Sequence, residues 1–360
     1  MKIGINSRIY QQSSTGIPYY IKCLYNKLSE NQDKFSFIFF QTSLNKKIGD
    51  TKIIKGPNNG LFGALFDLFF INCLIKKERV DIFHGPSNIL PFFKIKGIKY
   101  IVTIHDLSFL VFPKNHSLFF NLYYKYGIKR SLKNADVVIA QSENTKKDIL
   151  NFYKVSEEKI RVIYSGINKL FLEETKKERI IKEKYFFSLT THPKRKNILS
   201  VLEVMSRDKE LIKHKYLIAG LIGENQTAEL KDAIRKLELT DNVILWGYAS
   251  EDQLVNFYQN AVFFIYPSFY EGFGFPALEA MACKCPVITS KNSSLIEITP
   301  NKNWLINPYD LKDIYNKMVE ISNLEEKERE KLINDNYNFS KQFSWDKAAK
   351  EYAKLFDCLK

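Results

Sequence analysis

Ten short apolar runs alternate with helical segments along the whole chain, and this alternation constrains the fold more than any other feature. The runs cover residues 3–6, 36–40, 82–84, 101–104, 137–140, 185–189, 216–219, 243–245, 261–266 and 287–288. Continuous apolar strands separated by helices indicate parallel sheets that are covered on both faces. Ten strands are too many for one ordinary doubly wound sheet. We therefore predict an α/β protein with two Rossmann-like domains.

The charged, strand-poor segment 166–184 divides these runs, so we place the domain boundary near residue 170. This gives a first domain over residues 1–168, a linker over 169–184 and a second domain over 185–343. An amphipathic helix over 344–360 follows, with Ser344 as its N-cap. In open α/β sheets, ligands bind at the carboxyl ends of the strands. We therefore expect the two sheets to face each other across a cleft that contains the functional site.

Length and composition limit the class of protein. The 360 residues are 45% hydrophobic, which supports a sizeable core for two domains. The most apolar segment, 61–75, is interrupted by Asp67 and Asn72, so we expect no transmembrane helix. The chain begins with a strand pattern and not with a signal peptide. Its five scattered cysteines suit free thiols in a reducing cytoplasm.

The sequence contains no pattern that predicts a metal site or a serine nucleophile. Asp-x-Asp is absent, and no group of His and Cys has the spacing of metal ligands. We therefore expect no catalytic metal. A Gly-x-Ser-x-Gly elbow is also absent, so a serine hydrolase is not expected.

The net charge of +14 suggests an anionic partner. A basic protein can meet nucleic acid, anionic lipid or a phosphorylated substrate. No zinc finger or RNP-type aromatic motif is present, so nucleic acid is not expected. The segments 92–96 and 119–130 mix aromatic and basic residues, as membrane-surface segments do. Taken alone, however, each segment fits an ordinary helix with a core face and a solvated basic face better.

The segment 271–279 carries the most specific chemical signal. Glu271 and Glu279 lie eight positions apart around the turn Gly272-Phe273-Gly274, between the apolar run 261–266 and a short helix predicted over 276–283. The glycines let a ligand approach the backbone, and the helix N-terminus favours an anion such as phosphate. The two carboxylates suit a ligand that also carries hydroxyl groups. A nucleotide-sugar fits both requirements.

The same residues allow one competing interpretation. Residues 272–277 loosely fit the G-x-G-x-x-A pattern of a dinucleotide site. That pattern needs an acid for the ribose at the end of the next strand. Here the strand ends in Thr289-Ser290-Lys291, without an acid. A nicotinamide-dependent enzyme therefore stays the less favoured alternative.

A basic turn follows the first strand of the second domain. Lys194, Arg195 and Lys196 come just before a helix that starts near Asn197. Three cations at a helix N-terminus predict a diphosphate site. A solvated basic turn is the alternative, but the position at the carboxyl end of a strand favours a function.

Three polar turns follow strands of the first domain. His105 and Asp106 come after the run 101–104, where a histidine can donate to a substrate oxygen, transfer a proton, or simply cap the edge of the core. Residues 13–17, which include Gly16, could cradle a phosphate or the acceptor, although one glycine alone does not specify such a site. Residues 84–88 could line the acceptor side or form an ordinary turn.

Taken together, these motifs resemble those of the retaining glycosyltransferases of family 4, also called glycosyl transferases group 1, which have the GT-B fold. The resemblance covers nearly the whole chain and is most specific over residues 267–288. It is carried by residues 15–17, 102–107, 135–143, 159–166, 194–197, 267–274 and 343–345. It implies a GT-B architecture in which the C-terminal helix crosses back to the first domain.

The resemblance also implies roles for individual residues. Glu271 would contact hydroxyls of the donor sugar, and Glu279 would hold the ribose. Arg195 and Lys196 would neutralise the diphosphate, and His105 would lie near the reacting carbon or position 6 of the sugar. The other implied contacts are backbone groups around Gly272, Phe273, Gly274, Phe275 and Pro276 for the sugar and phosphate, backbone near Gly247 and Tyr248 for the base, and Gly16 and Asp106 on the acceptor side.

Three positions depart from the family pattern. Lys284 stands where the family usually has glycine at a helix C-cap, which costs about 1 kcal/mol of stability. The strand before the basic turn ends in Ser188-Leu189-Thr190, where many members have glycine, so one phosphate contact would be either missing or replaced by Lys194. Residues 290–298 lack the usual glycine pair but keep Glu297.

The leading hypothesis is a metal-independent retaining glycosyltransferase that needs no cofactor and uses a nucleotide-sugar as substrate. The sequences His-Asp-Leu and Pro-Lys-Arg-Lys-Asn resemble those of bacterial mannosyltransferases of O-antigen assembly. This implies GDP-mannose as donor and a polyprenyl-diphosphate-linked oligosaccharide as acceptor. The basic, aromatic first domain would dock peripherally on the inner, anionic face of the plasma membrane. The alternatives are a UDP-sugar-dependent transferase of the same fold, a nicotinamide-dependent enzyme and a catalytically silent binding protein.

Overall fold

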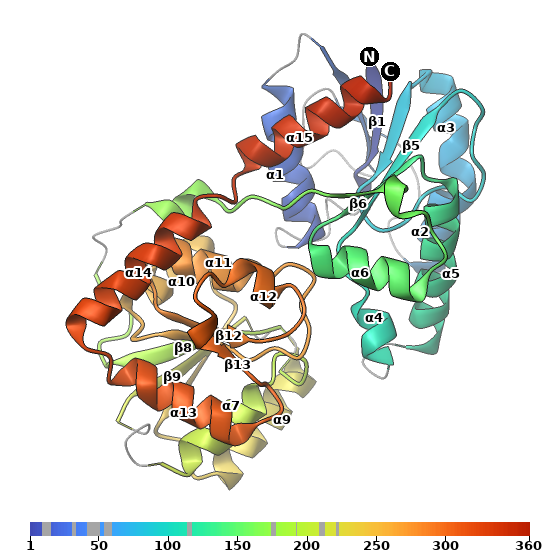
Figure 1. Ribbon diagram of the computed structural model, residues 1–360. Helices are drawn as coiled ribbons and strands as arrows, with labels where there is room; N and C mark the ends of the chain where they lie inside the picture. Colours follow the sequence, from blue (N-terminus) through green and yellow to red (C-terminus); the bar gives the residue numbers. More distant parts are fainter. Residues whose placement is uncertain are drawn as a thin grey trace. The chain divides into compact units, whose positions relative to one another are not determined.

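The computed structural model consists of two compact units (Figure 1). It describes residues 1–8, 16–30, 34–41, 51–53, 60–113, 117–173, 178–191, 193–208, 213–220 and 223–360, without the side chains of 51–53, 60–62 and 224–226. The first unit comprises Met1–Gly166 and Ser344–Lys360, and the second comprises Ile167–Phe343.

The first unit contains a seven-stranded parallel sheet with the order β3-β2-β1-β4-β5-β6-β7. Its strands are β1 (Lys2–Asn6), β2 (Ser36–Gln41), β3 (Thr51–Ile53), β4 (Ile82–Gly85), β5 (Lys99–Ile104), β6 (Val137–Ala140) and β7 (Ile160–Val162). Its helices are α1 (Ile17–Ser29), α2 (Gly60–Leu65), the π-helical η2 (Phe66–Phe70), α3 (Ile71–Glu78), α4 (Ser108–Val111), α5 (Leu118–Asn134), α6 (Glu143–Phe152), the 3₁₀ turn η4 (Glu157–Lys159) and α15 (Trp345–Cys358). The strand order reverses between β1 and β4, the position at which such sheets bind ligands.

The second unit contains a six-stranded parallel sheet with the order β10-β9-β8-β11-β12-β13. Its strands are β8 (Tyr185–Leu189), β9 (Lys215–Ala219), β10 (Val243–Gly247), β11 (Phe264–Tyr266), β12 (Val287–Ser290) and β13 (Leu305–Ile306). Its helices are α7 (Ile198–Ser206), α9 (Glu224–Lys236), α10 (Glu251–Asn260), α11 (Phe275–Ala282), α12 (Leu295–Ile298), α13 (Leu311–Ser322), α14 (Glu326–Ser340) and the 3₁₀ turns η5 (Lys169–Leu172) and η6 (Lys302–Trp304). Here the order reverses between β8 and β11.

These sheets confirm the predicted α/β class with two parallel sheets. Each of the ten predicted runs contains a strand, and all the strands that pair in the two sheets do so in parallel. The sequence missed β3, β7 and β13, which have two or three residues each and are too short to show a hydrophobic pattern. The predicted strand over 261–266 was too long at its start, because β11 begins at Phe264.

Helix α15 belongs to the first unit although it follows the second unit in the sequence. Trp345, Tyr352 and Phe356 are buried on one face of the helix. The Tyr352 hydroxyl lies 2.9 Å from Thr103 Oγ1 on β5 and 2.5 Å from the Tyr20 hydroxyl on α1. These contacts tie the end of the chain to its first helix and to the sheet.

The segment expected as a linker packs on the second unit where it is described. The Phe171 ring of η5 lies 6.1 Å from that of Tyr258 on α10, and the Asn256 amide donates to Glu178 O at 2.9 Å. Over the described parts of both units, no helix is long and apolar enough to cross a membrane.

Candidate active site

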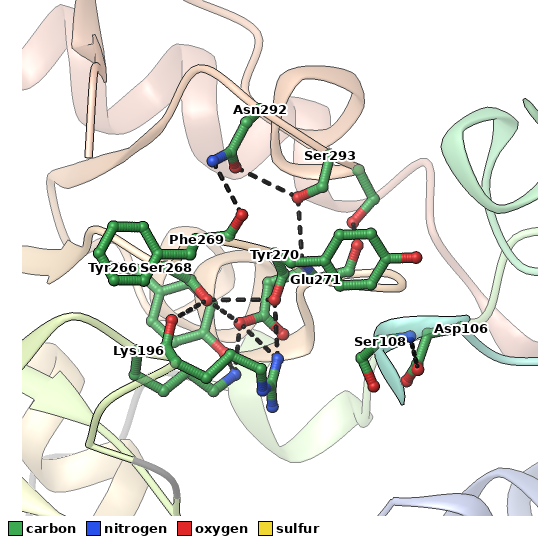
Figure 2. A network of polar contacts seen from close by, with 12 residues as sticks. Asp106, Ser108, Lys196, Tyr266, Ser268, Phe269, Tyr270, Glu271, Asn292 and Ser293 are labelled. Atoms are coloured by element: carbon green, nitrogen blue, oxygen red, sulfur yellow. Dashed lines mark hydrogen bonds and ion pairs between the residues drawn. The ribbon is translucent and has the colours of Figure 1, made fainter. Parts of the chain in front are cut away.

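A buried carboxylate with two cations forms the centre of the candidate site in the second unit (Figure 2). Glu271 Oε1 lies 2.5 Å from Lys196 Nζ and 3.3 Å from Arg195 Nη1. Lys196 and Glu271 are almost entirely buried, with 8% of each side chain exposed, and Arg195 is 20% exposed. Burial alone would raise the pKa of Glu271, but Lys196 and Arg195 outweigh it and lower this pKa to about 2. Glu271 is therefore a fixed anion at physiological pH.

The strand order explains why these three residues meet. Arg195 and Lys196 follow β8, and Glu271 follows β11, and these adjacent parallel strands pair in register. Both segments therefore leave the same edge of the sheet, where its strand order reverses. Asn197 adopts a left-handed conformation with φ of 56°, and this turns the basic segment into helix α7.

Hydrogen bonds from neighbouring loops hold the position of Glu271. The Ser268 hydroxyl donates to Glu271 Oε1 at 2.5 Å, and Glu271 N donates to Ser293 Oγ at 3.0 Å. The Ser294 hydroxyl donates to Glu271 O at 2.9 Å, and the Asn292 amide donates to Phe269 O at 3.0 Å. Figure 2 shows Asn292 and Ser293 on the side of Glu271 away from Lys196. The loops after β11 and β12 therefore form one rigid support for the carboxylate.

Tyr266 at the end of β11 is a third partner of Lys196. Lys196 Nζ donates to the Tyr266 hydroxyl and lies 4.5 Å from the centre of the ring. Burial raises the pKa of Tyr266 well above its usual value, and the charges of Glu271 and Glu279 raise it further. Tyr266 therefore stays a neutral phenol near both acids.

The glycine turn leads directly into helix α11. Gly274 has φ of 101° and is the N-cap of α11, and Pro276 lies in the first turn. A Cβ on Gly274 would lie 2.6 Å from Ile298 Cδ1 and 2.8 Å from Leu295 Cδ2, so only glycine fits. The Phe273 side chain is buried, with its ring 4.8 Å from that of Phe275. Phe273 can therefore offer a ligand only its backbone.

Glu279 lies one turn further along α11 and has a different environment. Its Oε2 accepts a hydrogen bond from the Tyr258 hydroxyl at 3.3 Å. Burial raises the pKa of Glu279 to about 7, and the charge of Glu251 adds to this effect. This carboxyl group therefore changes its charge near neutral pH.

Two other residues near this sheet edge have separate surroundings. Tyr248 follows Gly247, which has φ of 79°, and its side chain is 62% exposed. Lys194 does not join Arg195 and Lys196 but lies 3.0 Å from Glu229 of α9. His192 is outside the described residues.

In the first unit, His105 lies at the carboxyl end of β5. Its Nε2 donates to Pro86 O at 2.6 Å, and its backbone N donates to Asn88 Oδ1 at 2.9 Å. The Tyr20 ring packs edge-on against the imidazole at 4.9 Å. Burial lowers the pKa of His105, although hydrogen bonds with Pro86 and Gln141 oppose this shift. His105 is therefore a neutral, firmly oriented imidazole.

The remaining candidates of the first unit have structural contacts. Asp106 Oδ1 accepts from Ser108 N at 2.8 Å and so stabilises the start of α4, as Figure 2 shows. Gly16 is the N-cap of α1 with φ of 64°, and residues 13–15 lie outside the described part of the chain. His84 is fully buried, and burial lowers its pKa to about 3. His84 is thus a core residue and does not line a ligand site.

Several polar groups at the two sheets were not predicted from the sequence. Ser268, Tyr266 and Ser293 were inside or beside recognised motifs, but nothing in the sequence indicated their contacts with Glu271 and Lys196. In the first unit, Arg8 binds Asp67 of η2 through Nε and Nη2, at 2.8 and 2.5 Å. The only signal for this pair was an arginine just after the first strand. Among the described residues, no group of His, Cys, Asp and Glu could hold a metal ion.

Comparison with known proteins identifies the family. A model described as Glycosyltransferase Family 4 matches residues 23–169, and one described as Glycosyl transferases group 1 matches residues 171–339. The chain belongs to glycosyltransferase family 4. Both parts of this family 4 chain are thus matched, and the resemblance stated from the sequence is confirmed.

Relatives of this family 4 protein include two enzymes named for mannose transfer. The O-antigen chain mannosyltransferase RfbU of Salmonella typhimurium is 32% identical over 225 residues, which cover 62% of this chain and 61% of that relative. O-antigen chain mannosyltransferase B of Escherichia coli is 25% identical over 275 residues, which cover 74% of this chain and 71% of that relative. The match to RfbU thus leaves more than a third of its length uncovered.

The fold of this family 4 protein also matches a solved structure over its whole length. The sucrose-phosphate synthase of Thermosynechococcus elongatus is 19% identical, with a TM-score of 0.78 and coverage of 100% of this chain and 99% of that chain. At this identity the similarity concerns the fold, and it confirms the predicted GT-B class.

Proposed function

We propose that this protein is a metal-independent, retaining hexosyltransferase that moves mannose from GDP-mannose to a lipid-linked oligosaccharide. The observation that carries the proposal is the buried group of Glu271, Arg195 and Lys196 beside the N-terminus of α11. The names of the mannosyltransferase relatives support mannose as the sugar.

The charges of this group suit a nucleoside diphosphate. One carboxylate faces two cations, so the group has a net positive charge before any ligand binds. A diphosphate that approached Arg195 and Lys196 would be balanced by this charge and by the helix dipole of α11. We assign Arg195 and Lys196 to the diphosphate, and the backbone of Gly272, Phe273, Gly274 and Phe275 to the sugar and its phosphate.

The proposed reaction follows from these positions. An acceptor hydroxyl oxygen forms a bond to the anomeric carbon while the bond from that carbon to the diphosphate oxygen breaks. The hydroxyl proton passes to the leaving phosphate oxygen on the same face, and the sugar keeps its configuration. Because Lys196 and Arg195 are held by Glu271, Tyr266 and Tyr270, they can stabilise the leaving charge without reorganising.

The two acids receive different roles. We assign Glu271 to the hydroxyls of the donor sugar, since its carboxylate is always ionised and can only accept hydrogen bonds. Glu279 and Tyr258 are assigned to the ribose, and Tyr248 to the surroundings of the base. Because a carboxylate accepts hydrogen bonds from ribose hydroxyls better than a carboxylic acid does, nucleotide affinity is expected to fall as Glu279 gains a proton below about pH 7.

The first unit is assigned to the acceptor. We assign His105 to the reacting sugar, and Gly16 and Asp106 to the acceptor side, as the resemblance implies. A polyprenyl-diphosphate acceptor would place the protein at the inner face of the plasma membrane, in the assembly of a bacterial surface polysaccharide such as O-antigen.

Calorimetric titration of the purified protein with GDP, UDP, ADP and NAD, without added metal, tests the proposal. We expect GDP to bind and to be selected over the other three. Selection of UDP would mean that the donor is a UDP-hexose and not GDP-mannose. Binding of NAD alone would overturn the transferase assignment.

Matched variants test the role of Lys196. Lys196→Met removes the charge but keeps the length of the side chain, and we expect it to weaken GDP binding by roughly tenfold to a hundredfold. Lys194→Met, on the neighbouring exposed lysine, serves as the control and should change the affinity little. Equal losses in both variants would contradict the diphosphate role.

A further inference from the structure

Helix α5 exposes a row of large apolar side chains. Leu118, Phe119, Leu122 and Tyr126 are 75%, 61%, 44% and 62% exposed. Their spacing of three and four residues places them along one face of the helix. Single exposed apolar residues are ordinary, but a continuous row of this kind marks an interaction surface.

Arg130 connects this row to a second group of aromatic side chains. Its guanidinium lies 4.6 Å from the centre of the Phe92 ring, and its Nε donates to Phe92 O at 2.8 Å. Phe92 and Phe93, in the loop between β4 and β5, are 37% and 58% exposed. The contacts of Arg130 therefore make the two groups continuous.

The π-helical segment η2 extends the same surface. Phe69 is 40% exposed, and its ring lies 5.4 Å from that of Phe92 and 6.4 Å from that of Phe93. Phe70 is 61% exposed. Phe92 N donates to Leu68 O at 2.7 Å, which fixes the loop against η2. We call the set Phe69, Phe70, Phe92, Phe93, Leu118, Phe119, Leu122 and Tyr126 the aromatic stripe.

The surroundings of the aromatic stripe are strongly basic. The three segments that form it, 65–77, 92–99 and 117–134, contain nine lysines and arginines and one carboxylate. That carboxylate, Asp67, is bound to Arg8. Lys125, Lys129 and Lys133 of α5 are exposed. The side of the unit that carries α5 and η2 thus combines exposed aromatic rings with an excess of positive charge.

We propose that the aromatic stripe is the surface through which the first unit docks on an anionic lipid bilayer. The lysines would meet lipid phosphates, and the rings would enter the headgroup region, where amphipathic and aromatic side chains are stable. A second copy of the chain is a poorer occupant, because a two-fold contact through α5 would bring the exposed Lys125, Lys129 and Lys133 of both copies together. The proposal rests on the lipid-linked acceptor proposed above and adds the surface that would reach it.

Vesicle sedimentation of the full chain tests the proposal. We expect binding to mixed phosphatidylglycerol and phosphatidylcholine vesicles, loss of that binding as salt is raised, and little binding to phosphatidylcholine alone. The double variant Lys125→Glu with Lys129→Glu should lower the partition coefficient by roughly tenfold or more. A second variant, Phe93→Ser with Phe119→Ser, should lower it without changing the net charge.

The chain offers a matched control on α14. Lys327 and Lys331 are exposed lysines with the same four-residue spacing as Lys125 and Lys129. Lys327→Glu with Lys331→Glu should therefore bind vesicles like the wild type. Equal loss in this control would mean that net charge alone drives binding, and it would overturn the proposal.

Nucleotide binding separates this proposal from the proposed function. We expect all these variants to keep the GDP affinity of the wild type. Vesicle binding without any nucleotide binding would support the docking surface and contradict the proposed transferase function. The docking surface would be overturned if the wild type did not bind anionic vesicles. It would also be overturned if the stripe variants kept their vesicle binding and lost only binding to single-stranded RNA or self-association.

Discussion

Glu271 and Glu279 show how the surroundings of a carboxylate decide its charge. Burial raises the pKa of both, but Lys196 and Arg195 reverse this effect at Glu271 and bring its pKa to about 2. Glu279 has no cation to offset its burial among the described residues; the Tyr258 hydroxyl partly stabilises its charge, and its pKa is about 7. Two acids of one motif are thus divided into a fixed anion and a group that titrates near neutrality.

Glu279 should make stability depend on pH in a predictable direction. Its pKa of about 7 in the folded protein lies above the ordinary glutamate value of 4.5. The stability that protonated Glu279 contributes is therefore present below pH 4.5 and lost as the pH rises through 7. Since glutamine cannot ionise, Glu279→Gln should gain about 2–3 kcal/mol relative to the wild type between pH 5 and pH 8. Urea unfolding at both pH values measures this gain.

The control for this experiment is Glu330→Gln, on an exposed position of α14. Because this side chain is exposed, the substitution should change stability by less than about 0.5 kcal/mol. A Glu279→Gln effect that did not change with pH would show that the carboxyl group titrates normally.

At Lys284 the sequence predicted backbone strain at a helix C-cap, and the structure shows the left-handed conformation that causes such strain. Its φ is 59°, in the left-handed region. Lys284 N donates to Met281 O at 3.1 Å and Cys285 N donates to Ala280 O at 2.9 Å, which is the hydrogen-bond pattern of a Schellman C-cap. The lysine also lies 5.1 Å from the Tyr337 ring, a contact that offsets part of the strain.

Two substitutions separate the strain from the ring contact. Lys284→Ala and Lys284→Gly both lose the contact with Tyr337, but only glycine adopts the left-handed conformation without cost. We expect the glycine variant to be more stable than the alanine variant by about 1 kcal/mol, or about 2–4 °C in Tm. Thermal unfolding measures the difference, and equal Tm values would contradict the strain.

At the residue scale, the ion pair between Glu271 and Lys196 could not be predicted from the sequence. All the charged residues of this group were singled out, but each was assigned to a substrate. Lys196 and Glu271 are 75 positions apart in the sequence, and no local pattern connects them. Only the pairing of β8 with β11 shows that these groups neutralise one another before a ligand binds.

At the scale of elements, long buried strands could be predicted from the sequence, and short or partly exposed strands could not. Strands such as β5 and β8 are continuous apolar runs and were found from the sequence. Strand β7 has one exposed and one half-exposed residue among three, so it carries no such signal. The π-helical turn of η2 was also invisible, because its Phe-rich sequence fits an ordinary helix. Elements whose form depends on their neighbours could not be read from local sequence.

The contacts of α15 predict the effect of removing one hydroxyl. Tyr352→Phe leaves Thr103 Oγ1 and the Tyr20 hydroxyl without one of their partners in a buried site. We expect a loss of about 1–3 kcal/mol of stability, since buried polar groups that lose a partner keep their desolvation cost. Urea unfolding measures this loss. Tyr309→Phe, which removes a hydroxyl from a 72% exposed ring, is the control and should change stability little.

At the scale of the whole molecule, the chain passes between the units twice, after Gly166 and after Phe343. Ile167 N donates to Phe343 O at 3.1 Å, and a Cβ on Gly166 would lie 2.1 Å from Trp345 N. The two passages therefore run against each other, and Gly166 has no room for a side chain. The sequence predicted the boundary near residue 170 from a charged, strand-poor segment, whereas the close approach depends on residues far apart in the chain.

This arrangement predicts that shortening the chain will affect the units unequally. A chain that ends at Phe343 lacks α15, and the first unit then loses the buried side chains of Trp345, Tyr352 and Phe356. Because each such group contributes about 3–5 kcal/mol when buried, we expect the first unit to unfold at a much lower temperature. The second unit keeps all its own elements. Calorimetric melting should therefore show two transitions. The transition of the first unit should move to a lower temperature. The transition of the second unit should keep its Tm without ligand and move to a higher temperature when GDP is added. A single transition that falls as a whole, or loss of the GDP effect, would mean that the second unit depends on α15 for its fold.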